Sequence, residues 1–109
     1  MVHEAFQLLR KATSSQARQA AGHNEEQWRR FIIITREAAQ VIVHEHSDWT
    51  WPQVPFQEKE KVQAGVNARL AEERIPEVGT DVLRWRMSHA LGTARQASRL
   101  THQENASRG

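Results

Sequence analysis

One short run of side chains, His44-Glu45-His46-Ser47-Asp48, is of the kind that binds metal ions. Histidine pairs that bind a metal from one helix are four residues apart, whereas residues two apart point to different sides of the helix. The chain has no cysteine, so thiolate ligands cannot complete a site. We therefore interpret this run as the polar end of a helix and expect neither a metal nor another cofactor.

Catalytic motifs are also missing from the sequence. It contains no glycine-rich phosphate-binding loop, no Gly-x-Ser-x-Gly motif and no cysteine nucleophile. We interpret His89 and His102 as surface histidines. The sequence therefore predicts that the protein is not an enzyme.

Arginines in the segment Thr80–Leu100 form the most specific arrangement in the chain. At about 100° per residue, Arg84, Arg95 and Arg99 fall on one side of a helix, together with a serine and a histidine. A helix that reads DNA needs an apolar face that anchors it and a second face whose arginines reach phosphates or guanine edges. The candidate nucleic-acid contacts are Arg84, Arg86, Ser88, Arg95 and Arg99.

The same segment has the apolar face that such a helix requires. Its members lie about 110° round the helix from the arginines; they are Leu83, Met87, Ala90, Leu91, Ala94, Ala97 and Ser98. Thr80 is suited to cap the helix, and Asp81 places negative charge in its first turn. Trp85 points away from the apolar face, so it either contacts a partner or packs against the first helix.

Two further helices are predicted in the first half of the chain. The first spans residues 3–21 and ends at Gly22, which suits the left-handed conformation of a helix end. The second begins at Asn24, which forms a capping box with Gln27. Its broad apolar face, which predicts a central position, consists of Trp28, Phe31, Ile32, Thr35, Ala38, Ala39 and Ile42.

A break at residues 47–55 separates these helices from the second half, because it contains two prolines. Pro55 can begin a third helix that extends to Ile75. Its inward residues are predicted to be Phe56, Val62, Val66 and Leu70. A short link, in which Gly79 is expected to adopt a conformation that other residues resist, then leads into the arginine-bearing helix.

Large apolar groups outside the predicted core indicate a second possible kind of site. Trp49 and Trp51 lie in the break, where they either close the edge of the core or form a contact surface. Ile33 falls among the polar residues of the second helix. The candidate partner-binding residues are Ile33, Trp49, Trp51 and Trp85.

Charge is distributed unevenly along the 109 residues, whose formal net charge is +2. Residues 1–46 carry six basic and five acidic side chains, residues 47–81 four and seven, and residues 82–109 five and one. The middle is therefore acidic and the end basic. Such a distribution is typical either of two oppositely charged faces that neutralise each other within a fold or of a surface that binds a polyanion. No apolar run approaches the roughly 18 residues that span a bilayer, so no membrane partner is expected.

The predicted helix at 55–75, the link and the helix at 80–100 together have a helix–turn–helix outline. In helix lengths and in the Trp-Arg pair of the last helix, Phe56–Leu100 resembles the three-helix domains of the homeodomain-like and Myb-like families. The tryptophans at positions 28, 49, 51 and 85 depart from the Myb spacing, and the homeodomain asparagine has no counterpart. Membership of neither family is inferred, and no residue roles are carried over.

Together these patterns predict an all-α protein, a single compact four-helix domain with a helix-turn-helix-like C-terminal part. Residues 1–22 form the N-terminal helix, 24–100 the core and 101–109 a frayed tail. The predicted function is DNA binding by the basic helix, in an intracellular protein that regulates transcription in the nucleus. The alternative is a protein-interaction module, in which the second helix and the Trp49/Trp51 loop bind a partner or a second copy.

Overall fold

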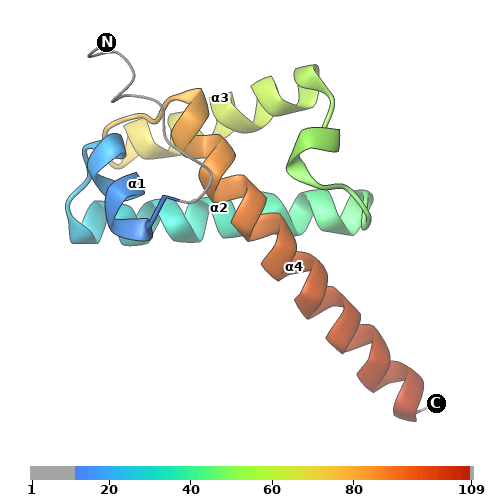
Figure 1. The fold of residues 1–109 in the computed structure, drawn as a ribbon. Coiled ribbons are helices and arrows are strands. Elements are labelled where there is room, and N and C mark those ends of the chain that lie inside the picture. Colours follow the sequence, from blue (N-terminus) through green and yellow to red (C-terminus); the bar gives the residue numbers. More distant parts are fainter. Residues whose placement is uncertain (1–11, 109) are drawn as a thin grey trace.

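Four α-helices and one short 3-10 helix make up most of residues 12–108, the part of the chain that the computed structural model describes (Figure 1). Side chains are described for residues 12–100. The elements are α1 (Ser14–Ala21), α2 (Glu25–Glu45), the 3-10 helix η2 (Trp51–Gln53), α3 (Phe56–Glu72) and α4 (Thr80–Arg108). The described residues contain no strand, and the prediction of an all-α fold with four helices is confirmed.

Capping boxes determine where the first two helices begin. The Thr13 hydroxyl accepts a hydrogen bond from the Gln16 backbone N–H, and the Gln16 side chain accepts one from the Thr13 N–H. Asn24 and Gln27 exchange the same two bonds at the start of α2, as predicted. The first helix was expected over residues 3–21; α1 begins at Ser14, and residues 3–11 lie outside the described part.

Two helices end in residues with left-handed backbone conformation. Gly22 has φ 73° after α1, and Arg74 has φ 61° after α3; no other described residue has a positive φ. In both cases the next residue donates its N–H to the carbonyl five residues earlier, from His23 to Arg18 and from Ile75 to Leu70. This is the Schellman pattern. It confirms the prediction for Gly22 and ends α3 at Glu72, three residues before the predicted Ile75.

Gly79 differs from the prediction, because its φ is not positive. Its carbonyl accepts the first helical hydrogen bond of α4, from the N–H of Leu83, so Gly79 rather than Thr80 is the residue that precedes the helix. A Cβ added at Gly79 would lie 3.4 Å from the Asp81 carboxylate, which is ordinary contact. The prediction that this position demands glycine is therefore wrong.

Gly22→Ala and Gly79→Ala are expected to differ in stability. Alanine at Gly22 must adopt the left-handed conformation, which costs roughly 1–2 kcal/mol for a residue with a Cβ. The melting temperature should fall by several degrees, since about 1 kcal/mol corresponds to roughly 4–8 °C in a domain of this size. Gly79→Ala, the matched control, should change it by less than half as much. Equal effects in thermal melts followed by circular dichroism would contradict this assignment.

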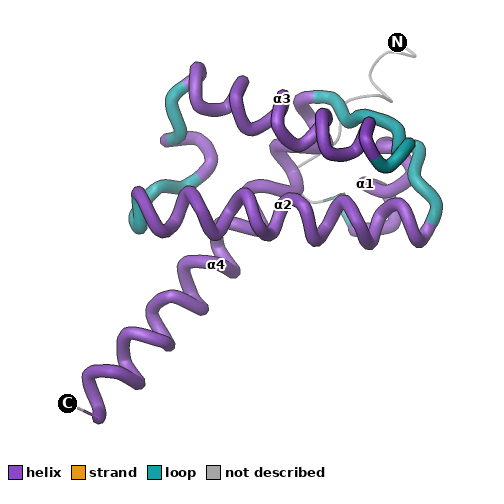
Figure 2. Tube along the Cα trace, turned by 180° about the vertical axis from the view of Figure 1, so that it is seen from behind, coloured by secondary structure: helices purple, strands orange, loops and turns teal. Residues whose placement is uncertain are grey.

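The central element is α2, against which both α3 and α4 pack (Figures 1 and 2). The most extensive contact between the described elements is that of α2 with α4, while α1 and η2 each contact α4 as well. The C-terminal part of α4 projects past α2 (Figure 1). The helix was expected to end at Leu100, before a tail at residues 101–109, but α4 continues to Arg108. No proline interrupts the chain after Pro76, so nothing in the sequence requires the helix to stop at Leu100.

The core lies where the apolar faces of α2, α3 and α4 meet. Trp28, Phe31 and Ile42 of α2 are buried as predicted, and Ile32 is half-buried. The largest fully buried side chains are Phe31, Ile34, Leu70, Leu83, Met87, Leu91 and Thr35. Phe56 departs from the prediction, since it is 72% exposed. It is the first residue of α3, where no other described element covers it.

Side-chain hydrogen bonds secure the link between α3 and α4. The Asn67 side chain accepts from the Val78 N–H at 2.8 Å and donates to the Val78 carbonyl at 3.0 Å. Nε2 of the buried His23 lies 2.8 Å from the Pro76 carbonyl and ties the link to the turn between α1 and α2. These bonds hold the link against α3 and against the turn after α1, and together with packing on α2 they position α4.

Candidate nucleic-acid interface

Arg84, Ser88, Arg95 and Arg99 line one side of α4, which we call the α4 stripe. Arg84, Ser88 and Arg99 are exposed and Arg95 is half-buried. Leu83, Met87 and Leu91 of the same helix are buried almost completely, so the helix is anchored by one side and presents the other. The stripe is about 22 Å long at 1.5 Å per residue. That length is sufficient to reach phosphates on both edges of a major groove about 12 Å wide.

Arg95 is held in place by the loop that follows α2. Its Nη1 donates a hydrogen bond to the Trp49 carbonyl at 2.8 Å. The Trp49 ring is itself stacked on His46, with ring centroids 3.6 Å apart and an interplanar angle of 8°. The Arg95 guanidinium therefore has a defined direction before any ligand binds, which lowers the entropy lost on binding.

A shallow recess lies between this loop and α4, lined by Val43, Ser47, Asp48, Arg95, Ser98 and Arg99. Asp48 brings one negative charge to the recess. Among the described residues it forms no ion pair with Arg95 or Arg99, because neither nitrogen-to-oxygen distance is within 4 Å. The two arginines thus remain available to an external anion, although Asp48 opposes its approach.

Arg86 does not belong to the α4 stripe. Its Nε donates to the Thr35 hydroxyl at 2.7 Å and its Nη2 to the Ile32 carbonyl at 3.0 Å, both on α2. On a helix with about 100° per residue, Arg86 and Arg95 lie on opposite sides. The sequence predicted Arg86 as one of the outward arginines that contact nucleic acid. In the structure its side chain contacts α2 instead.

Two of the tryptophans considered for a partner surface are core residues. Trp51 is 5% exposed and Trp85 is 9% exposed. The Trp85 Nε1 donates to the Ala12 carbonyl at 2.8 Å, and its ring packs beside Trp28, with centroids 6.2 Å apart. The prediction that Trp51 and Trp85 belong to a contact surface is thus corrected, because both side chains lie in the core. Trp49 and Ile33 are half-buried and keep part of their surface exposed.

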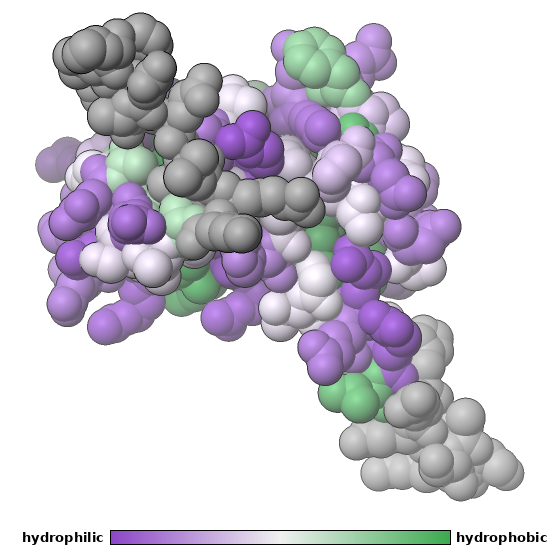
Figure 3. Space-filling view, viewed as in Figure 1, coloured by the Kyte–Doolittle hydropathy of each residue, from purple (hydrophilic) through white to green (hydrophobic). Residues whose placement is uncertain are grey.

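Ion pairs between helices concentrate on the side where α2 meets α3. Arg30 makes a two-pronged pair with Glu73, with both distances 2.7 Å, and Arg69 pairs with Glu37 at 2.6 Å. The face drawn in Figure 3 is mainly hydrophilic, with small separate hydrophobic areas. Arg30 and Arg69 are therefore neutralised within the domain, whereas the α4 stripe has no acidic residue of α4 between Val82 and Leu100.

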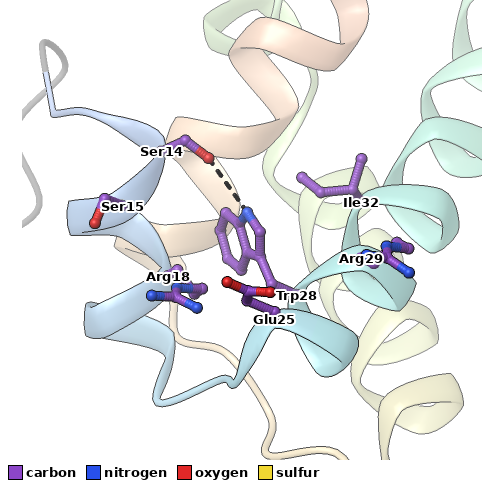
Figure 4. A pocket seen from close by; sticks show the side chains of 7 residues that line it. All are labelled: Ser14, Ser15, Arg18, Glu25, Trp28, Arg29 and Ile32. Carbon is purple, nitrogen blue, oxygen red and sulfur yellow. Dashed lines mark hydrogen bonds between the residues drawn. The ribbon is translucent and has the colours of Figure 1, made fainter.

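A second recess lies between α1 and α2 and was not noticed in the sequence (Figure 4). Ser14, Ser15 and Arg18 come from α1, and Glu25, Trp28, Arg29 and Ile32 come from α2. The Trp28 Nε1 donates to the Ser14 hydroxyl at 3.3 Å across it. Arg18 and Arg29 line the same recess only because α1 folds back on α2, so no local pattern could have indicated it. Figure 4 shows Glu25 beside Arg18.

Comparisons with protein-family models, with curated proteins and with solved structures gave no match. In the described part of the chain, no helix is long and apolar enough to cross a membrane. No group of three or more metal-binding side chains gathers there either, and the run at residues 44–48 forms no such group.

Proposed function

We propose that this domain binds nucleic acid through the α4 stripe, with DNA as the expected ligand. The observation that carries the proposal is the pairing of an exposed arginine stripe with a fully buried apolar stripe on one helix. The buried side holds the helix in position, and the exposed side offers guanidinium groups, which suit phosphates and guanine edges. A role in transcription regulation in the nucleus would follow from this proposal.

The distribution of ion pairs supports this choice of surface. The arginines that meet α3 are neutralised by carboxylates, so a polyanion gains little by approaching that side. Arg99 has no acidic partner among the described residues, and Arg95 bonds only a neutral carbonyl. Each phosphate that such arginines neutralise releases counterions from DNA, which makes the binding free energy favourable and dependent on salt.

The test is fluorescence anisotropy with a labelled DNA duplex at 50 and 200 mM salt. The triple variant Arg84→Ala, Arg95→Ala and Arg99→Ala should weaken binding at least about tenfold at low salt, because it removes up to three phosphate contacts. It should also lower the slope of log K against log salt by about three units. Its melting temperature should fall by only a few degrees, since Arg95 loses one hydrogen bond, to the Trp49 carbonyl, which is worth about 1 kcal/mol.

Two controls separate this surface from general charge. Arg30→Ala with Arg69→Ala removes two arginines on the α3 side and should leave DNA affinity nearly unchanged. Asp48→Asn removes a negative charge from the recess beside Arg95 and Arg99, and should strengthen binding. Unchanged affinity of the triple variant at low salt would end the proposal for this surface.

A specific observation also favours the alternative, a protein-interaction module. A shallow apolar groove runs between α2 and α3, lined in part by Ala38, Val62 and Gly65, and Val41 beside it is 58% exposed. Binding in such a groove would hardly respond to salt, whereas DNA binding weakens steeply with salt. The burial of Trp51 and Trp85 removes two of the residues on which this alternative depended.

A further inference from the structure

Arg86 is a cation with unusual surroundings. Its side chain leaves α4 and ends against α2, where its hydrogen-bond partners are the Thr35 hydroxyl and the Ile32 carbonyl. Thr35 is completely buried, and its hydroxyl in turn donates to the Phe31 carbonyl at 2.7 Å. The guanidinium is therefore fixed in direction by a rigid part of α2. The third nitrogen, Nη1, makes no hydrogen bond among the described residues.

No carboxylate neutralises this arginine in the described part of the chain. Burial, together with the nearby positive charge of Arg36, lowers the pKa of Arg86 to about 10. At neutral pH the group still carries its proton, so the fold holds a half-buried positive charge without a counter-ion. Arg30 and Arg69 differ from Arg86 in this respect, because Arg30 pairs with the Glu73 carboxylate and Arg69 with that of Glu37.

Arg36 brings a second positive charge to the same place. It follows Thr35 in α2 and lies one helical turn from Ile32, and both of these residues bind the Arg86 guanidinium. Arg36 is exposed, and it has no hydrogen bond or ion pair among the described residues. Two neighbouring guanidinium groups repel each other unless an anion lies between them.

We propose that Arg86 and Arg36 form a binding site for a phosphate group. The free Nη1 of the Arg86 guanidinium would provide the fixed part of the site, and the exposed Arg36 side chain would contact the ligand from the solvent side. Phosphate suits the pair because it is a multiply charged acceptor that guanidinium groups bind with two parallel hydrogen bonds. Free inorganic phosphate and a nucleic-acid backbone both present this group, and the experiment below separates these sources.

This site is independent of the proposed function. Arg86 faces α2, on the side of α4 opposite Arg95. If the α4 stripe does not bind DNA, the proposal of a phosphate site at Arg86 and Arg36 is therefore unaffected. In the same way, a failure of the phosphate site would leave the α4 stripe as it is.

The test is a titration with inorganic phosphate at pH 7, with sodium chloride adjusted to keep the ionic strength constant. Nitrogen-15 NMR of the arginine Nε–H groups gives a separate signal for Arg86, whose Nε–H is held by Thr35. The expected result is a saturable shift of the Arg86 and Arg36 signals with a millimolar dissociation constant. Arg36→Gln should weaken phosphate binding about tenfold, the effect of losing one charge-assisted hydrogen bond.

Arg69→Gln is the matched control, since it removes a guanidinium that is already neutralised by the Glu37 carboxylate. It should leave phosphate affinity unchanged. Because Arg36 is exposed, Arg36→Gln should retain the original melting temperature, so a loss of binding cannot be a loss of folding. Equal shifts with chloride or acetate, or full phosphate affinity in Arg36→Gln, would overturn the proposal.

A second titration, with a short DNA duplex, identifies the source of the phosphate. If the duplex supplies it, Arg36→Gln weakens duplex binding and the duplex displaces inorganic phosphate from Arg86. If the natural ligand is a small anion, the duplex leaves the Arg86 signal in place while phosphate still moves it. Either result supports the site, and the triple variant of the α4 stripe reports separately on the proposed function.

Discussion

Phe31→Ala is expected to lower the free energy of unfolding by about 3–5 kcal/mol. Phe31 is completely buried, and its ring lies 5.0 Å from that of Trp28 and 5.7 Å from that of His23 between centroids. Alanine would leave a cavity where three elements of the core meet, and a rigid helix face cannot collapse to fill it. Equilibrium unfolding in urea measures the change.

Phe56→Ala provides the matched control, because the same chemical change is made at a side chain that is 72% exposed. Exposed substitutions of this kind usually alter stability by no more than about 0.5 kcal/mol. Similar losses in the two variants would contradict the burial that the structure assigns to them. They would indicate that Phe56 is covered in solution, for instance by a second copy.

Trp85→Ala should have an effect of similar size, about 3–5 kcal/mol. The indole packs beside Trp28 and lies 4.6 Å from the His89 ring between centroids, and its Nε1 binds the Ala12 carbonyl. Trp85→Phe keeps most of the ring but removes the donor. It should cost roughly 1–3 kcal/mol, since the Ala12 carbonyl is left without its partner.

The same pair of variants examines the position of Trp85 relative to the α4 stripe. Because the indole is buried, Trp85→Phe should bind a DNA duplex as well as the original protein does. A stability change below about 1 kcal/mol in Trp85→Ala, measured by urea unfolding, would mean that the side chain is exposed in solution. A loss of DNA affinity in a fully folded Trp85→Phe would place the tryptophan in the interface.

Signals that depend on a few neighbouring residues were predicted well from the sequence. The capping box at Asn24, the helix end at Gly22 and the burial of Phe31 each follow from local spacing, and all three are present. Helix periodicity also separated Met87 and Leu91 from the exposed Arg84 and Arg99. For these residues, the side of the helix on which they lie decides their environment.

Trp85 and Arg86 show where such reasoning stops. Periodicity gives the direction in which a side chain leaves its own helix, but not which other element lies there. Trp85 points away from the main apolar face of α4, and the segment at Ala12 together with Trp28 buries it. Arg86 lies among arginines in the sequence, yet α2 offers it a hydroxyl and a carbonyl. The recess of Arg18 and Arg29 likewise depends on how α1 folds back.

Helix ends were predicted less well, for two physical reasons. Arg74 adopts the left-handed conformation that the sequence rules assign to glycine, so nothing marked the end of α3 at Glu72. In the other direction, α4 continues past Leu100 because no residue there breaks a helix, although its apolar periodicity ends. The loss of apolar periodicity shows only that the helix no longer has an apolar face to bury. The helical backbone can still continue beyond that point.

The hydrogen bond between His23 and Pro76 has a consequence for the order of folding. It joins two turns that are 53 residues apart in the chain, the turn after α1 and the link before α4. Closing so long a loop costs entropy that neither turn can recover alone. We therefore expect this bond to form late, after α1–α2 and α3–α4 have come together. We expect early folding to depend instead on the local helix ends, and the two most distant turns to meet last.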